Sequence, residues 1–305
     1  MRIFNEFQYG FLDGIGRPLA DKLYKLRPNW TAASISDRDA AFFAGLAMTV
    51  RPCKVVEVGV ASGWGSVVFL EALASTRCES THYFGVDIAE RFFYDQKYAT
   101  GEAVSEVASH RAHHYRLLTG RAMAEVAEEI GPGIDFAFID AHHMHPWPTL
   151  DLLSLLPYLK PESWIALHDL NLCRKQDQEH QNRGPKYLFE AWEEDKAHSI
   201  EIPTMAGAIR IGKRPEEHLP LLLDILHTPW ELTVEERFLS PLIAAVSRSY
   251  GSTWGNEFLR AVDVGNYLKN ATHGRSFDFL YDRIARLRSS VSKNAKDLLT
   301  RVVER

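Results

Sequence analysis

The sequence predicts an α/β fold in which a doubly wound parallel sheet of about seven strands is followed by a helical extension. Two observations lead to this prediction. From Lys54 onward, short runs rich in β-branched or aromatic residues alternate with longer segments of helical periodicity, which is typical of parallel strands joined by helices. After Pro215 the helical periodicity continues, but no further run of comparable strength predicts a strand.

The expected elements follow one another along residues 34–214, which we interpret as one α/β domain after an N-terminal segment of residues 1–33. A first helix is expected because apolar residues from Phe42 to Val50 repeat at helical spacing after Ser36 and Asp37. Strands are expected at residues 55–58, 83–86, 115–118, 134–139, 164–167, 200–202 and 208–211. Helices are expected between them at residues 66–74, 96–109, 122–130, 149–159 and 186–196.

The carboxyl-terminal residues 215–305 are expected to form a helical extension, with helices at residues 219–226, 241–249 and 277–303. The first of these helices has an apolar face that needs a partner. We expect this extension either to mediate self-association or to cover the substrate cleft, with packing inside the chain as the alternative. The face consists of Leu221, Leu222, Ile225 and Leu226.

Composition excludes several classes of protein. The 305 residues are 46% apolar and 25% charged, as in soluble globular proteins, and the formal charge of -5 without a basic stripe argues against a nucleic-acid partner. Three scattered cysteines, Cys53, Cys78 and Cys173, predict neither a disulfide framework nor a cysteine zinc site. Residues 1–19 lack a secretory pattern, and no apolar run is long enough to span a bilayer. We therefore expect a cytoplasmic protein without a membrane partner.

A glycine-rich turn between the first strand and the next helix is the first candidate binding site. Its glycines allow a sharp turn and close approach of a ligand, and the helix that follows offers free N–H groups. The spacing Gly-x-x-x-Gly-x-Gly departs from the dinucleotide fingerprint Gly-x-Gly-x-x-Gly, which disfavours a nicotinamide-dependent oxidoreductase without excluding it. The candidate residues are Glu57, Gly59, Gly63, Gly65 and Ser66.

Asp87 stands at the end of the second expected strand. A carboxylate at that place can accept hydrogen bonds from the two vicinal hydroxyls of a ribose, as in other nucleoside-binding α/β sheets. The alternative is a capping or turn aspartate. Its position after the glycine turn and a short strand favours the ribose ligand.

In order and spacing, these motifs resemble the class I S-adenosylmethionine-dependent methyltransferases, in particular their small-molecule O-methyltransferase branch. Beside the glycine turn and Asp87, the matching segments are residues 118–122, 138–143 and 165–170. The resemblance implies a Rossmann-like methyltransferase sheet, S-adenosylmethionine as cofactor, and methyl transfer to a hydroxyl of a small molecule such as a sugar or a natural-product scaffold.

The resemblance also implies residue roles around the cofactor. Glu57 and Gly59 would lie against its methionine part, Asp87 would hold the ribose, and Asp140 would contribute to the same site. Arg121 departs from the acidic or small polar residue that is common at its position. Gly120, Arg121 and Ala122 would flank the adenine.

Many relatives in this branch bind a divalent cation after the fourth and fifth strands, which here gives Asp140, His168 and Asp169. Carboxylates at two strand ends of one sheet can bind Mg²⁺. His168 departs from the pattern, and it either shifts preference toward Mn²⁺, Fe²⁺ or Zn²⁺ or faces the substrate. The alternative is that Asp140 and Asp169 only cap or bind neighbouring loops.

The loop after Asp140 contains His142, His143 and His145. Metal-dependent sugar O-methyltransferases of the macrolide-tailoring kind, which this region resembles, have a catalytic histidine three residues after the aspartate. The resemblance therefore implies that His143 is the general base. A zinc site made from the three histidines is the alternative, and it would need further ligands.

Other residues have weaker functional interpretations. Trp147 between two prolines is a candidate to stack on the acceptor, whereas Trp164 begins a strand and is expected in the core. Arg174, Lys175 and Arg183 could pair with an acidic acceptor, although solvated loop charges are commoner. A non-catalytic binding or assembly protein that keeps the fold remains the second alternative function.

Overall fold

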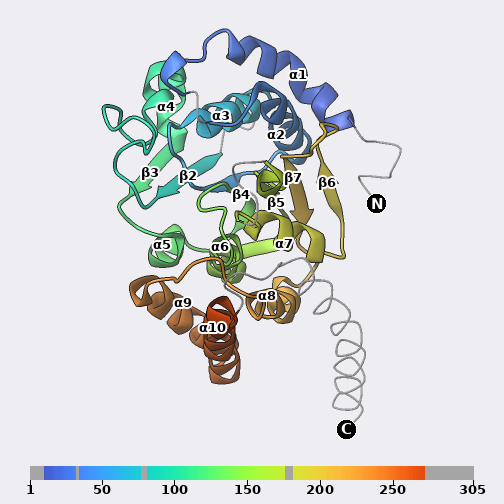
Figure 1. The fold of residues 1–305 in the computed structure, drawn as a ribbon. Helices are drawn as coiled ribbons and strands as arrows, with labels where there is room; N and C mark the ends of the chain where they lie inside the picture. Colours follow the sequence, from blue (N-terminus) through green and yellow to red (C-terminus); the bar gives the residue numbers. More distant parts are fainter. Residues whose placement is uncertain (1–9, 32–33, 77–80, 176–180, 272–305) are drawn as a thin grey trace.

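A seven-stranded sheet with helices on both faces forms the centre of the molecule (Figure 1). The structure, a computed structural model, describes residues 10–31, 34–76, 81–175 and 181–271. The strand order is β3-β2-β1-β4-β5-β7-β6. The strands are β1 (Lys54–Val58), β2 (His82–Asp87), β3 (Tyr115–Thr119), β4 (Ile134–Ile139), β5 (Leu159–Leu167), β6 (Lys196–His198) and β7 (Gly207–Arg210). This arrangement confirms the predicted α/β fold.

Strands β1 to β5 run parallel to one another, but β7 pairs antiparallel with both β5 and β6. The expectation of a parallel sheet is therefore wrong for β7 alone, because β6 is antiparallel to β7 and so runs in the same direction as β5. Only residues 199–206 join β6 to β7, which is shorter than a parallel crossover connection requires.

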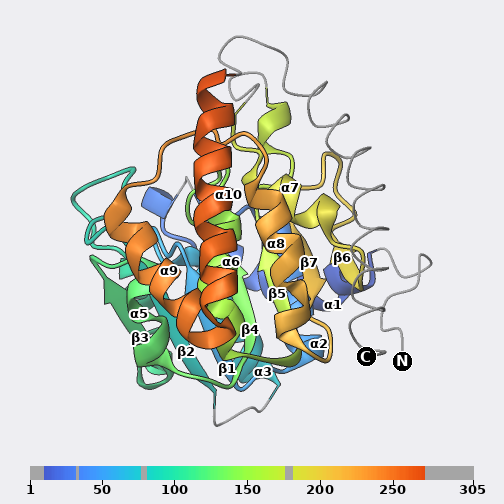
Figure 2. The same ribbon diagram turned by 90° about the horizontal axis from the view of Figure 1, so that it is seen from below.

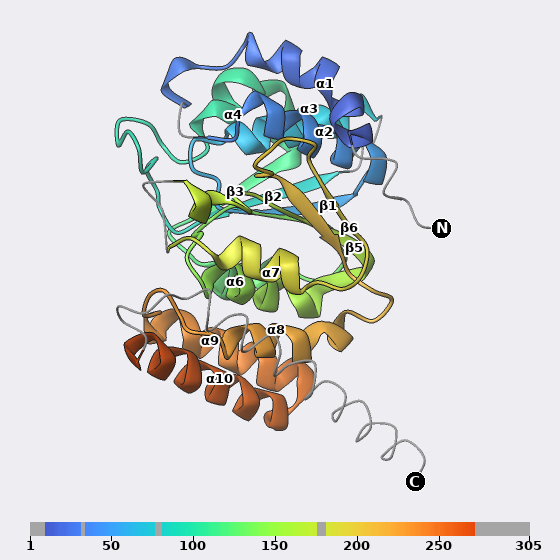
Figure 3. The ribbon, with the colours of Figure 1, turned by 45° about the vertical axis from the view of Figure 1, so that its right-hand side comes forward.

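The helices form layers above and below the sheet, and a further layer lies outside the lower one (Figure 3). One face carries α1 to α4, the other carries α5 to α7, and α8 to α10 pack outside α6 and α7. The helices are α1 (Phe11–Tyr24), α2 (Asp37–Val50), α3 (Trp64–Ser75), α4 (Glu102–Val107), α5 (Met123–Ile130), α6 (Trp147–Leu155), α7 (Gly184–Ala191), α8 (Leu219–Leu226), α9 (Glu236–Tyr250) and α10 (Ser252–Ala271). No helix within the described ranges is long and apolar enough to cross a membrane.

Two apolar clusters hold these layers on the sheet. On the α2 and α3 face, the rings of Phe43, Phe69 and Phe138 are fully buried and lie within 6 Å of one another. The other cluster joins the opposite sheet face to α5, α6 and the extension. Full burial of a large apolar side chain contributes about 1.5–3 kcal/mol, so both faces are firmly covered.

Helix α1 was not expected from the sequence, and it packs closely on α2. A Cβ atom added to Gly16 of α1 would lie 1.9 Å from the Ala41 carbonyl oxygen, and one added to Gly45 would lie 1.9 Å from that of Leu12. The two glycines thus allow contact between helix backbones that larger residues would prevent. Helix α2 begins as predicted, because the Ser36 side chain accepts the N–H of Asp39.

Several predicted boundaries are wrong. Residues 200–202 are not a strand, since Ile200 and Ile202 are 57% and 94% exposed in the loop that follows β6. The helix expected at 96–109 is shortened to α4 because the left-handed Gly101 precedes it and a 3-10 turn follows it. The helix expected at 149–159 ends at Leu155, ahead of a 3-10 turn and of β5, which begins at Leu159.

The described part of the extension packs inside the chain (Figure 2). Leu222, Ile225 and Leu226 are fully buried, and Trp230 is buried with its indole N–H donated to the Leu226 carbonyl. The apolar face of α8 therefore has an intramolecular partner. Helix α10 was not predicted, and the helix expected at 277–303 lies outside the described residues.

Candidate active site

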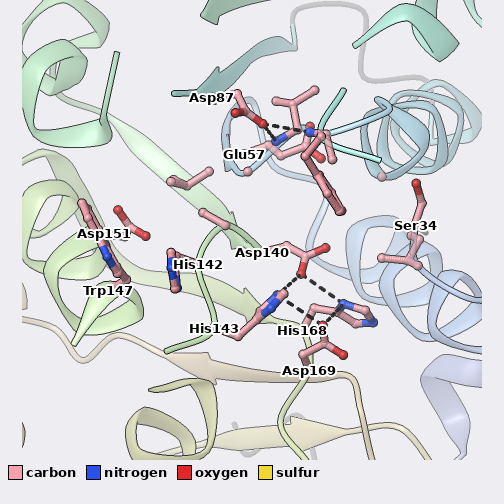
Figure 4. A pocket seen from close by; sticks show the side chains of 18 of the residues that line it. Ser34, Glu57, Asp87, Asp140, His142, His143, Trp147, Asp151, His168 and Asp169 are labelled. Carbon is pink, nitrogen blue, oxygen red and sulfur yellow. Dashed lines mark hydrogen bonds and ion pairs between the residues drawn. The ribbon is translucent and has the colours of Figure 1, made fainter. Parts of the chain in front are cut away.

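A cavity of about 800 Å³ opens where β1, β2, β4 and β5 end (Figure 4). This is the place where open α/β sheets bind ligands, and the volume suits a small-molecule site. Of the thirteen residues predicted for the catalytic, cofactor and metal sites, ten line it, whereas Gly63, Ser66 and Gly120 are not among the lining residues. The ten are Glu57, Gly59, Gly65, Asp87, Arg121, Ala122, Asp140, His143, His168 and Asp169.

The glycine turn after β1 is held tightly against its neighbours. Gly59 has a φ of 93°, and an added Cβ would lie 2.4 Å from the Asp140 carbonyl oxygen. Gly63 has a φ of 86°, and its Cβ would lie 2.7 Å from the Cα atom of Gly101. Both positions thus need glycine for conformation and for space.

Glu57 lies at the floor of this turn and is almost fully buried. Its Oε2 atom accepts hydrogen bonds from the hydroxyls of Ser66 and of Tyr83, the latter at 3.0 Å. Burial raises the pKa of Glu57 to about 8, although these two hydrogen bonds oppose the rise. A Cβ at Gly65 would lie 2.8 Å from Glu57 Oε1, so the third glycine makes room for this carboxyl.

Asp87 accepts three backbone N–H groups. Its Oδ2 atom lies 2.9 Å from the nitrogens of Val60 and Ala61, and Oδ1 lies 2.8 Å from that of Ala89. A carboxylate offers about four acceptor positions, so roughly one remains for a ligand unless a backbone contact is given up. Asp87 therefore also fixes the glycine turn, and the expectation that it accepts both ribose hydroxyls stays a prediction.

The segment after β3 supplies a wall of the cavity. Arg121 lines it, but its guanidinium pairs with Glu129 at 2.8 Å. The N–H of Ala122 is donated to the Glu125 side chain, which caps α5. The adenine-flanking roles of Gly120, Arg121 and Ala122 stay predictions.

Asp140, His143 and Asp169 meet at the ends of β4 and β5 (Figure 4). His143 Nε2 lies 3.2 Å from both Asp140 Oδ1 and Asp169 Oδ2, and one ligand atom from each residue fits within 4.8 Å of the others. Burial lowers the pKa of His143, but the two carboxylates outweigh it and raise the pKa above its usual value. Burial raises the pKa of Asp140, but His168 and His143 lower it to about 2.

His168 lies behind this cluster, between acidic groups on two sides. Its Nδ1 atom is 3.1 Å from Asp140 Oδ1, and its Nε2 atom is 3.3 Å from Asp39 Oδ2. Burial lowers the pKa of His168, but Asp140 and Asp169 raise it well above the usual value. Both ring nitrogens thus face carboxylates.

The donor set fits a divalent cation with His143 in the place predicted for His168. Two carboxylate oxygens and one imidazole nitrogen suit Mn²⁺, Fe²⁺ or Zn²⁺ better than Mg²⁺. Among the described residues, Asp140, His143 and Asp169 are the group whose donor atoms come close enough. The predicted ligand role of His168 stays a prediction. To bind a cation, one ring nitrogen of His168 would have to give up its contact with Asp140 or Asp39.

The three loop histidines do not gather into a zinc site in the described structure. The ring of His142 stacks on Trp147 at a centroid distance of 6.2 Å. His145 is buried away from the cluster, with Nε2 2.9 Å from the Thr228 hydroxyl. His143 alone of the three faces Asp140 and Asp169.

The other sequence candidates separate into cavity and core. Trp147 lines the cavity and is supported from behind by Phe238 of α9, at a centroid distance of 5.3 Å. Trp164 is 3% exposed and belongs to the core, as expected. Of the three basic candidates, Lys175 lines the cavity, whereas Arg174 and Arg183 do not.

Two acidic residues of the cavity were missed by sequence reasoning. Asp39 follows the capping residue Ser36 by three positions, and such an acid is usually explained by the cap alone. Asp151 stands in an otherwise apolar helix, where an acid signals an unusual environment. That signal was available in the sequence.

Part of the chain is similar to a known protein family. A family model described as a methyltransferase domain matches residues 56–170. No match to a curated protein is found. None of the structural likenesses below assigns a substrate to this chain.

Three solved structures illustrate the likeness. The O-methyltransferase TomG from Streptomyces achromogenes, solved with SAM, is 14% identical, with a TM-score of 0.44 over 65% of this chain and 86% of that chain. An O-methyltransferase from Bacillus cereus, solved with SAH, is 16% identical, with a TM-score of 0.41 over 64% of this chain and 89% of that chain. The SAH-bound Podospora anserina methyltransferase PaMTH1 is 12% identical, with a TM-score of 0.46 over 64% of this chain and 87% of that chain.

Proposed function

Because a methyltransferase-domain model matches residues 56–170, we propose that this protein is an S-adenosylmethionine-dependent enzyme that transfers a methyl group to a hydroxyl of a small molecule. One observation supports this most directly. The glycine turn with Asp87 and the cluster of Asp140, His143 and Asp169 open into the same cavity. The proposed nucleoside site and the proposed site for activating a hydroxyl would thus share one cavity.

The chain's contribution to the reaction is first one of positioning. Methyl transfer needs the acceptor oxygen in line behind the sulfonium methyl group, and holding that geometry supplies much of the rate enhancement. The turn residues Gly59 and Gly63 and the carboxylate of Asp87 are held by backbone contacts before any ligand arrives. Such a preformed site loses little freedom on binding.

His143 is the proposed base, and its Nε2 atom would accept the hydroxyl proton. A neutral imidazole can do this and a protonated one cannot. Asp140 and Asp169 would stabilise the protonated ring that results, since an oxygen of each lies 3.2 Å from that nitrogen.

The same two carboxylates are the proposed cation ligands, with His168 as a further candidate. A divalent cation bound there would hold the acceptor oxygen and lower its pKa. His143 Nε2 is close enough to be a third ligand, but one nitrogen lone pair cannot bind a cation and accept a proton at once. We assign His143 the role of base, and Mn²⁺ binding by a His143 variant distinguishes this role from that of a cation ligand.

The acceptor is proposed to be a hydroxylated sugar or natural-product scaffold. The cavity lining also includes the aromatic Phe93 and the cations Arg91 and Lys175. Such a surface suits a partly apolar molecule that carries hydroxyl or acidic groups. No nucleic-acid or membrane partner is proposed, and self-association through the extension stays a prediction.

Calorimetry with S-adenosylhomocysteine tests the nucleoside half of this proposal. Asp87→Ala should weaken binding by roughly 1.5–3 kcal/mol, the value of one hydrogen bond to a charged group, and by up to about 4 kcal/mol if both ribose hydroxyls bind. Asp135→Ala is the matched control, because Asp135 likewise accepts two backbone N–H groups, but at the opposite end of β1. Unchanged affinity in Asp87→Ala would remove this residue from the site, and no binding by the wild type would refute the function.

A further inference from the structure

Asp151 is a buried acid that the proposed chemistry leaves unused. It lies on α6, four residues after Trp147, so both side chains are on the same face of that helix. It is 5% exposed and lines the cavity, and its Oδ2 atom has no hydrogen-bond partner among the described residues. Burial raises the pKa of this carboxyl to about 7.

An acid in this position is costly for the free protein. Leaving a buried polar group without a partner costs about 1–3 kcal/mol, and such groups are rare in folded proteins. The carboxyl is therefore best explained by a hydrogen-bond donor that arrives with a ligand.

The surroundings of Asp151 indicate the kind of ligand group. Trp147 and Asp151 lie together on the side of the cavity away from the cluster of Asp140, His143 and Asp169 (Figure 4). Helices α5 and α6 pack on each other, and Ala122 and Met123 at the start of α5 line the same cavity. Aromatic and apolar side chains thus surround one acceptor, which suits a flat heteroaromatic ring with an amino group.

The opposite end of the cavity has a different character. Ser34 lines the cavity there (Figure 4), and its hydroxyl is a polar group suited to an amino-acid moiety. A ligand whose ribose lies at Asp87 therefore has its base toward Asp151 and its methionine part toward Ser34.

We propose that Asp151 accepts a hydrogen bond from the exocyclic amino group of the cofactor's adenine. This inference rests on the proposed function. Arg121, which stands where an acceptor was expected, has only donors and is paired with Glu129. The acceptor that the base needs is thus supplied from α6 instead. Either protonation state of the carboxyl has an oxygen that can accept this N–H.

The test compares two ligands, S-adenosylhomocysteine and its analogue in which hydrogen replaces the 6-amino group of the purine. Calorimetry on the wild type should show that the analogue binds roughly ten- to a hundredfold more weakly. Asp151→Ala should bind S-adenosylhomocysteine more weakly by a similar factor, whereas its affinity for the analogue should equal that of the wild type. This pattern is the signature of a direct contact. Asp151→Asn, which keeps an acceptor oxygen and the side-chain size, should recover part of the loss.

Thr149→Val is the control variant, because Thr149 is a fully buried residue of α6 that does not line the cavity. It should leave both affinities unchanged. Equal wild-type affinity for the two ligands, or equal losses for both ligands in the Asp151 variants, would overturn the assignment of Asp151 while leaving the proposed function intact. Failure of the wild type to bind S-adenosylhomocysteine would overturn both. The wild-type comparison needs no variant to fold.

Discussion

His168 Nε2 lies 3.3 Å from Asp39 Oδ2, and this contact joins the end of β5 to helix α2 across 129 positions of the chain. The other ring nitrogen faces Asp140. A buried imidazolium between carboxylates balances charge that would otherwise be costly at the base of the cavity. Burial raises the pKa of Asp39, but His168 outweighs it and lowers that pKa below its usual value. The pair therefore supports the catalytic cluster from behind.

Stability should depend on pH through this pair. The folded-state pKa of His168 is raised well above 6.5. The contribution of His168 to the free energy of unfolding is therefore complete below about pH 6.5 and is lost as pH rises toward the folded-state pKa. Asp39→Asn should reduce the free energy of unfolding by about 3–5 kcal/mol near pH 6 and flatten its decline at higher pH. Urea denaturation at pH 6, 7.5 and 9 measures both effects.

Asp37→Asn is the matched control for this prediction. Asp37 is the first residue of the same helix, and its exposed carboxylate lies 3.9 Å from Arg17. Its replacement should change stability by less than about 1 kcal/mol at every pH. Similar losses in the two variants would show that the His168 pair has no special role.

Glu57 should lower the stability of the ligand-free protein at alkaline pH. Burial raises its pKa to about 8 from 4.5, so the folded state resists ionisation and loses stability as pH rises between these values. Glu57→Gln removes that loss, and it should gain on the order of a few kcal/mol over the wild type between pH 5 and pH 8. Denaturation curves at both pH values provide the measurement, with a change of the exposed Glu193 to Gln as control. An identical pH dependence in wild type and Glu57→Gln would contradict the buried, protonated carboxyl.

His143 and the two carboxylates can be assigned separate roles by two readouts. As the base, His143→Ala should lower kcat by roughly 10² to 10⁴ with cofactor affinity unchanged, and the wild-type rate should fall as pH drops through its raised pKa. Asp169→Asn or a chelator should also impair turnover without weakening cofactor binding. Full activity in excess chelator would refute the cation and leave His143 to act alone.

Metal binding can be measured before an acceptor is identified. Titration of the protein with Mn²⁺, followed by the magnetic resonance of the free ion, should show weaker binding in Asp140→Asn and Asp169→Asn. If His143 is only the base, His143→Ala should bind Mn²⁺ as well as the control His142→Ala does. Weaker Mn²⁺ binding in His143→Ala alone would make His143 a ligand and would exclude the same nitrogen as base.

The helical extension should support the cavity wall. Phe238 of α9 packs edge-on against Trp147, so Phe238→Ala should weaken S-adenosylhomocysteine binding by about 0.5–1.5 kcal/mol through a less well-held ring. Trp230→Ala removes a fully buried side chain and should lower the free energy of unfolding by about 3–5 kcal/mol. A chain ending at Lys213 that stays soluble and binds the cofactor normally would contradict both expectations.

Periodicity and turn chemistry were enough to predict the central strands and the glycine turn. Strand β4 has the predicted boundaries, and Ser36 caps α2 as expected, because these features depend on residues close in sequence. The prediction of a strand at residues 200–202 is wrong because long-range pairing decides this segment. Its alternating isoleucines have a strand pattern, but their place in the sheet was already taken by Lys196–His198 pairing with β7.

The sequence by itself thus determined the fold class, the cavity at the strand ends and a part of the residues that line it. Only the tertiary structure decided which side chains meet there. The packing of α2 sets Asp39 against His168, and that of α6 turns Asp151 into the cavity, where its Oδ2 atom has no partner among the described residues. Hydrogen bonds and ion pairs need a few ångströms of separation between residues far apart in the chain, and that distance is set by how helices pack on the sheet rather than by any local pattern.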